Sequence, residues 1–202
     1  KVSLKIIELL TSNFDVNLTI LSTTDFDVQH IENHSGFSID TSRINCVIVT
    51  IPAFLRYRFF HLKIALLHRK AKQLAPSFSH CISTYNELDF GKPAFQYVHH
   101  PMMASDSVLS KKHLARKKPI LITVVSVFIR KLSHMLAQRN LDTIPNNITA
   151  TNSNFINTIY QEIYAAPSRV IYPSILGELK KADIQKKKQV ICVSRFSPNK
   201  NI

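Results

Sequence analysis

The chain has 202 residues, of which 45% are hydrophobic, so it is long enough and apolar enough to fold around a core. Its formal net charge of +13 favours an anionic partner, such as a nucleotide diphosphate, lipid head groups or nucleic acid, although a solvated basic surface would explain the same charge. The 3 glycines, Gly36, Gly91 and Gly177, are too far apart to form a glycine-rich phosphate-binding loop, which excludes that class of nucleotide site.

The first half of the chain alternates predicted helices with predicted strands. Residues 1–12 have the apolar pattern of a helix, and residues 15–22 alternate and are rich in β-formers. The β-branched run 44–51 fits a strand that is covered on both faces, although it could also be part of a helix. A long helix is predicted over 54–74, and its basic residues are spread around it, which weakens a membrane-surface role for that segment.

The second half repeats the alternation. Strands are predicted at residues 80–84, 95–99, 147–152, 169–172 and 190–193. Helices are predicted at 119–139, where a buried helix is expected, and at 154–164, with Ser153 as its N-cap. This order predicts an α/β fold with a Rossmann-like parallel sheet, in which ligands bind at the carboxyl ends of the strands.

The cysteines indicate the cellular compartment. Cys46, Cys81 and Cys192 stand alone in apolar runs, and an odd number without C-x-x-C spacing argues against a disulfide framework or a zinc site. They are predicted to be buried strand residues in a reducing compartment, so we expect a cytoplasmic protein. No apolar run reaches the ~18–20 residues that a membrane-spanning helix requires.

The last predicted strand, 190–193, is followed by a polar turn that carries Arg195 and Lys200. A strand, a polar turn and a helix form the usual phosphate site of α/β proteins, because loop amides and the helix N-terminus face the anion. Arg195 can offer a planar fork to phosphate oxygens, and Lys200 can offer a point charge.

Three stretches of sequence, in this order, carry a family resemblance. The first is STYNELDFG at 83–91 with QYVHHP at 96–101, the second is NITATNSNF at 147–155 with RVIYP at 169–173, and the third is VICVSRFSPNK at 190–200. Together they resemble the retaining glycosyltransferases of the GT-B type, which have two Rossmann-like domains, and in particular glycosyltransferase family 4.

The resemblance implies transfer of a sugar from a nucleotide-diphosphate sugar to an acceptor hydroxyl, with retention of configuration and with no metal or cofactor. It implies that Arg195 and Lys200 bind the donor diphosphate and that His99 is the catalytic residue near the transferred sugar. A strand-end histidine bonded to backbone is the alternative for His99. Glu87 and Asp89 could contact the acceptor, or they could order their loop.

The resemblance also implies a domain organisation. Residues 1–172 would form an N-terminal acceptor domain that lacks its first strand and Gly-rich turn, 173–189 a linker, and 190–202 the start of a donor-binding domain. We expect such a chain to be inactive alone. The family pattern has glycine where this chain has Ser194 and glutamate where it has Asn199, so a pseudoenzyme remnant is an alternative.

A second alternative is a basic, non-catalytic module that binds anionic membrane lipid or nucleic acid. The net charge and the lysine clusters at 111–118 and 180–188 support it. No nucleic-acid motif is present and no aromatic residues interleave with those lysines, which argues against nucleic acid. The expected partners are therefore a nucleotide-sugar donor, a carbohydrate or lipid-linked acceptor and, for a peripheral protein, an anionic membrane surface.

Overall fold

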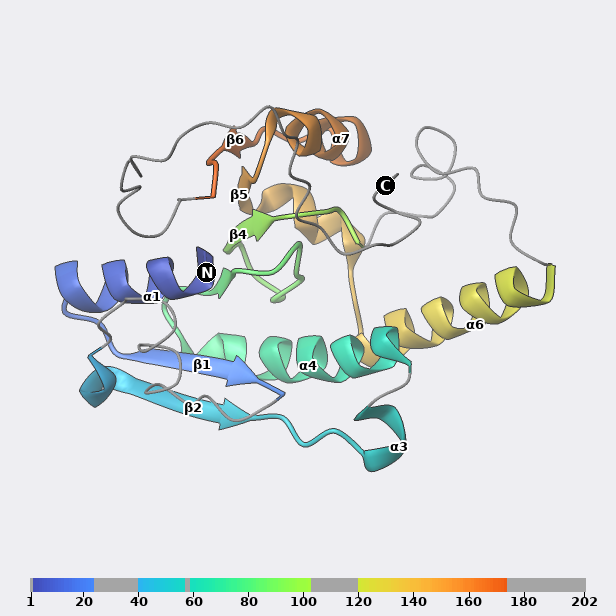
Figure 1. Cartoon of the computed structure of the whole chain (residues 1–202), viewed down its shortest axis with the longest axis horizontal. Helices are drawn as coiled ribbons and strands as arrows, with labels where there is room; N and C mark the ends of the chain where they lie inside the picture. The colour runs from blue at the N-terminus through green and yellow to red at the C-terminus, as the bar shows by residue number, and fades with distance from the viewer. Residues whose placement is uncertain (1, 24–39, 57–58, 103–119, 174–202) are drawn as a thin grey trace, which may run out of the picture.

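The computed structural model describes residues 2–23, 40–56, 59–102 and 120–173 (Figure 1). The predicted strand at 190–193, Arg195, Lys200, Cys192 and almost all of the predicted linker lie outside the described residues. Within these ranges, no helix combines the length and the apolar character needed to cross a bilayer.

The described strands form two parallel sheets. In the smaller sheet, β1 (Leu18–Ser22) pairs with β2 (Ile44–Ile48). The larger sheet has the order β3 (Ile82–Ser83), β4 (Phe95–Val98), β5 (Ile148–Thr151) and β6 (Arg169–Val170). Every strand pair is parallel, which confirms the predicted α/β class and is consistent with a Rossmann-like fold.

Helices flank both sheets (Figure 1). Among the described residues, the α-helices are α1 (Val2–Asn13), α3 (Ala53–Arg56), α4 (Phe60–Leu74), α6 (Ile120–Ala137) and α7 (Asn154–Tyr164), and the 3-10 helices are η1 (Thr41–Arg43), η2 (Ala75–Ser77) and η3 (Leu141–Asn146). The predicted bounds of α7 are confirmed, and so is its cap, because the Ser153 hydroxyl accepts a hydrogen bond from the Ile156 amide at 3.3 Å.

The long helix predicted over 54–74 is interrupted. Helix α3 ends at Arg56 and α4 begins at Phe60, and Phe59 between them has a left-handed backbone with φ 55°. A right-handed helix cannot continue through that conformation. No local signal predicted this break, since neither glycine nor proline stands near Phe59.

Two predictions of burial were wrong. The strand at 44–51 ends at Ile48, and it is not covered on both faces, because Cys46 is exposed and Ile48 is 49% exposed. Val124, Val125, Val127 and Phe128 of α6 are also exposed, since this part of α6 extends beyond the end of α4, against which the rest of α6 packs (Figure 1). Cys81, by contrast, is buried as predicted.

The core between the larger sheet and α7 is apolar at its centre. Its buried residues are Val98, Ile144, Ile156, Ile159, Tyr160 and Ala166. A second buried cluster lies beneath the loop that follows β3, with Leu88 and Phe90 packed near Ala75, Cys81 and Ala94.

Next to this core lies a buried network of polar side chains. The Gln96 amide donates to the Thr149 hydroxyl at 2.8 Å and to the Tyr160 hydroxyl at 3.0 Å. The Asn147 amide donates to Gln96 Oε1 at 2.9 Å and to the Leu88 carbonyl at 3.1 Å. Buried polar groups are stable only when bonded in this way, so the network links β4, β5, α7 and the loop after β3.

Candidate functional site

The loops that follow β3 and β4 meet at the carboxyl edge of the larger sheet. Asn86, in the first loop, accepts hydrogen bonds on Oδ1 from the backbone amides of His99 and His100, both at 2.9 Å. The backbone amide of Asn86 donates a hydrogen bond to the Tyr97 carbonyl at 3.0 Å. Asn86 has φ 63°, a left-handed conformation that asparagine tolerates better than most residues. One asparagine thus joins the two loops.

Glu87 follows Asn86 and is almost fully buried, with 1% of its surface exposed. Its Oε1 accepts a hydrogen bond of 2.9 Å from the hydroxyl of Tyr164, at the end of α7. Burial raises the pKa of Tyr164 strongly, and the Glu87 charge adds to the effect, so the phenol remains a proton donor at every ordinary pH. Glu87 therefore connects the loop to α7.

Asp89 is buried, and its carboxylate forms hydrogen bonds within its own loop and to neighbouring segments. It accepts hydrogen bonds from Lys72 Nζ at 2.6 Å, the Gly91 amide at 2.7 Å, the Asn140 amide at 2.8 Å and the Thr143 hydroxyl at 3.0 Å. Burial alone would raise the pKa of Asp89, but these donors outweigh it and hold the pKa below its usual value. Of the two roles expected for Asp89, these contacts favour loop ordering.

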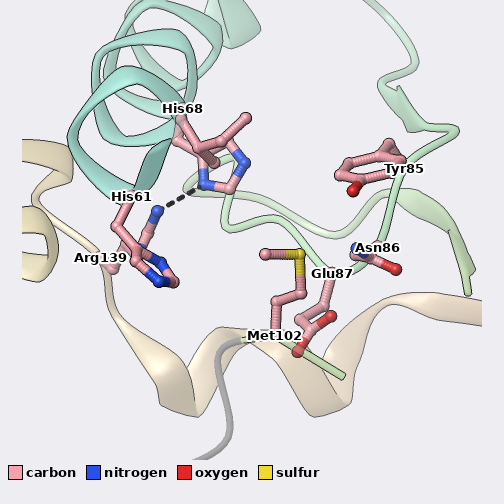
Figure 2. Close-up of a pocket in the computed structure, with 8 residues that line it drawn as sticks. His61, His68, Tyr85, Asn86, Glu87, Met102 and Arg139 are labelled. Carbon is pink, nitrogen blue, oxygen red and sulfur yellow. Dashed lines mark hydrogen bonds between the residues drawn. The ribbon is translucent and has the colours of Figure 1, made fainter. Parts of the chain in front are cut away.

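A pocket opens beside these loops (Figure 2). Its cavity volume is about 20 Å³, close to what a single water molecule needs, and the cavity is open to solvent on one side. Its lining comes from α4, from the loops after β3 and β4, and from the residue two positions after α6: His61, Ile64, His68, Tyr85, Asn86, Glu87, Met102 and Arg139. A pocket at the carboxyl ends of parallel strands lies where α/β proteins bind ligands.

The charged groups of the pocket are Arg139 and Glu87, with His68 beside them. Arg139 Nη2 lies 3.0 Å from His68 Nδ1 (Figure 2). Burial lowers the pKa of His68 to about 3, helped by the Arg139 charge and opposed by Asp89. Burial also lowers the pKa of Arg139 to about 10, against the attraction of Glu87. At neutral pH, Arg139 is therefore charged and donates to a neutral imidazole.

This arrangement can bind a polar ligand. Arg139 Nε is buried and has no acceptor among the residues that the structure describes. The N–H group on this atom therefore remains unbonded. Tyr85, 54% exposed, adds an aromatic ring to the pocket wall. In the described part of the chain, no three His, Cys, Asp or Glu side chains are arranged to hold a metal ion.

His99 lies next to the pocket rather than in its lining. Its ring packs edge-on against Tyr97, with centroids 4.9 Å apart, and lies 6.2 Å from the ring of Tyr85. Partial burial lowers the pKa of His99, while the Thr84 carbonyl favours the protonated ring. Its backbone is bonded to Asn86 and Asn152.

The sequence analysis named Glu87 and His99, which lie at this edge of the sheet, but it did not name the pocket residues Arg139, His68 and His61. One signal was present, since His61 and His68 are seven residues apart and so share one face of α4. No comparable signal marked Arg139, which reaches the pocket only because α6 ends just before it. Comparison of the chain with protein-family models, with curated proteins and with solved structures gives no match.

Proposed function

We propose that the chain forms the acceptor side of a retaining glycosyltransferase, which transfers a sugar from a nucleotide-diphosphate sugar to an acceptor hydroxyl. The main support is the contact made by Asn86. It joins the loops after β3 and β4, so two stretches that resemble one acceptor-domain segment of such enzymes meet beside a pocket. Ligands of open α/β sheets bind at this edge.

In this proposal the acceptor lies across the open mouth of the pocket and directs one hydroxyl group into it. Glu87 offers a hydrogen-bond acceptor, Arg139 offers donors, and Tyr85 offers a ring on which a sugar can stack. His99, beside Tyr85, would face the transferred sugar. Arg195 and Lys200 would neutralise the leaving diphosphate, which requires no metal if protein cations suffice.

Saturation-transfer NMR with a panel of neutral oligosaccharides tests the acceptor side. Sugar protons are expected to receive saturation from the protein, and Tyr85→Ala is expected to abolish the transfer. The matched control is Tyr172→Ala, which removes another exposed tyrosine outside the pocket and should leave the signal unchanged. Absence of transfer to every saccharide, or equal transfer in both variants, would contradict the proposal.

Titration with nucleotide-diphosphate sugars tests the donor side. Binding is expected to weaken at least about tenfold in the double variant Arg195→Ala/Lys200→Ala, because two charge-assisted contacts to phosphate are lost. Unchanged binding in that variant would rule out the pair as the diphosphate site.

A further inference from the structure

The pocket is much smaller than the ligand proposed for it. Its volume of about 20 Å³ is enough for a hydroxyl group, whereas a whole sugar ring is many times larger. The body of the acceptor therefore has to lie outside the mouth, on the surface that surrounds the pocket. The residues of that surface, and not the pocket lining alone, then determine which acceptors bind.

An exposed aromatic ring lies next to the pocket lining at the start of α4. His61 lines the pocket (Figure 2), and the ring of Phe60 lies edge-on to the His61 ring, with centroids 6.0 Å apart. Phe60 is 48% exposed, so its ring is available to a ligand. Together with Tyr85, which lines the pocket from the loop after β3, it gives the surface here two exposed aromatic rings.

The position of Phe60 depends on an unfavourable backbone conformation. Phe59 has φ 55° and ψ 52°, a left-handed conformation that a residue of this size rarely adopts. Its carbonyl accepts hydrogen bonds from the amides of Leu62 at 2.8 Å and Lys63 at 3.2 Å, so Phe59 sets the first turn of α4. The Phe59 ring is 46% exposed, so burial of that ring does not account for the conformation. Strained residues of this kind are concentrated at ligand-binding sites.

The residues that follow Phe60 are polar, which indicates the kind of ligand that suits its ring. His61 comes directly after it, and Lys63, almost one helical turn further along α4, carries N–H donors. A sugar ring combines an apolar face of C–H groups with a rim of hydroxyl groups, so it can stack on Phe60 and bond to neighbouring polar side chains. An alkyl chain could make no use of those donors.

We infer that Phe60 forms a second sugar-binding subsite, so that the preferred acceptor is a disaccharide or longer saccharide. The unit at the mouth directs its hydroxyl into the pocket beside Tyr85, and the next unit stacks on Phe60. The 6.0 Å between the Phe60 and His61 rings is close to the length of one sugar unit. Phe59 is a positioning residue, because its backbone fixes how α4 begins. This inference rests on the acceptor role proposed above and names the class of acceptor.

Saturation-transfer titrations with matched sugars test the subsite. The probes are methyl glucoside and methyl galactoside, with the disaccharides maltose, cellobiose and lactose beside them. In the wild-type chain, at least one disaccharide is expected to bind about fivefold more tightly than the methyl glycoside of its terminal unit. Phe60→Ala is expected to remove this preference, because the ring for the second unit is lost. Phe60→Tyr, which keeps an aromatic ring, is expected to preserve it.

The role of Phe59 has its own pair of variants. Phe59→Gly allows the left-handed backbone and is expected to keep the preference for the disaccharide, whereas Phe59→Val opposes that backbone and is expected to reduce it about threefold. The control is Phe14→Ala, at a phenylalanine that is 59% exposed directly after α1. The end of α1 and the start of α4 lie at opposite sides of the fold (Figure 1), so this variant should bind as the wild type does.

The contrary results separate this inference from the proposed function. If the disaccharides bind no more tightly than the methyl glycosides, the pocket still receives a sugar but the Phe60 subsite is refuted. If Phe60→Ala weakens binding of octyl glucoside and of no disaccharide, the ring contacts an alkyl chain and the subsite is again refuted. An equal loss in Phe59→Gly and Phe59→Val would overturn the positioning role. If no sugar binds at all, the proposed function fails and this inference fails with it.

Discussion

The carboxylate of Asp89 offers the sharpest test of how the site is held together. Its side chain is only 1% exposed and accepts four hydrogen bonds, from Lys72, Gly91, Asn140 and Thr143. Asp89→Asn keeps the shape of the side chain but removes its charge and turns one acceptor atom into a donor. The amide nitrogen would then face groups that themselves donate.

The expected cost follows from those contacts. Each hydrogen bond to a charged group contributes about 1.5–3 kcal/mol, and asparagine can keep the bonds made to only one of the two oxygens. Lys72 is partly hydrated, so its share is smaller. We expect Asp89→Asn to lower the free energy of unfolding by about 3–4 kcal/mol. Asp142→Asn, the same change at an exposed side chain nearby, should cost less than about 0.5 kcal/mol.

Urea denaturation followed by circular dichroism measures both variants. The pH dependence gives a second readout. Because the folded-state pKa of Asp89 lies below the unfolded value of about 3.9, its contribution is complete above that pH and is lost as the pH falls through the folded-state pKa. The difference between wild type and Asp89→Asn should therefore shrink in acid. Equal midpoints for Asp89→Asn and Asp142→Asn, or a difference that grows in acid, would refute the reasoning.

Three further predictions concern the pocket and its supports. Asn86→Ala should cost about 2–3 kcal/mol, and Asn86→Gly about 1 kcal/mol less, because glycine keeps the left-handed backbone while both lose the bonds to His99 and His100. Tyr164→Phe should cost about 1.5–3 kcal/mol, since it removes a donor to a buried carboxylate. His68 should keep a neutral ring down to about pH 5 in ¹H–¹⁵N NMR spectra of the imidazole, since its pKa is lowered to about 3. An unfolded histidine binds a proton near about pH 6.5, so this ring costs stability as the pH falls from there.

Each of these has a contrary outcome. Equal losses for Asn86→Ala and Asn86→Gly would remove the argument from backbone conformation. Tyr172→Phe is the control for Tyr164, and a similar loss at that exposed phenol would mean that the bond to Glu87 contributes nothing specific. A protonated His68 at about pH 5 would show that its ring is neither buried nor held against Arg139.

The alternation of strands and helices was readable because hydrophobic periodicity is local. The helix at 154–164 has a capping serine, an apolar stripe and a following proline, so all local signals agree. The break at Phe59 and the exposure of α6 could not be predicted from local sequence signals. Both depend on which segments lie nearby in space, and an apolar run has the same sequence whether or not a neighbour covers it.

The same distinction holds for the candidate site, where some residues could be predicted from local sequence and others could not. Glu87 and His99 follow strands, so the parallel topology alone brings them to one edge of the sheet. Arg139 and His68 are 71 positions apart and meet only through the packing of α6 on α4, so no local pattern encodes that contact. The motif residues Asn86, Asp89 and Gln96 proved to be bonded mainly to other parts of the protein.

The buried network around Gln96 has a consequence for how the larger sheet keeps its alignment. Its strands are short, β3 and β6 having only 2 residues each, so a backbone ladder alone would resist sliding only weakly. The bonds from Gln96 to Thr149 and Asn147 exist in one alignment of β4 with β5 and in no other. Loops outside these contacts can therefore change length without disturbing the sheet, whereas an apolar residue at Gln96 would leave β4 free to shift along β5.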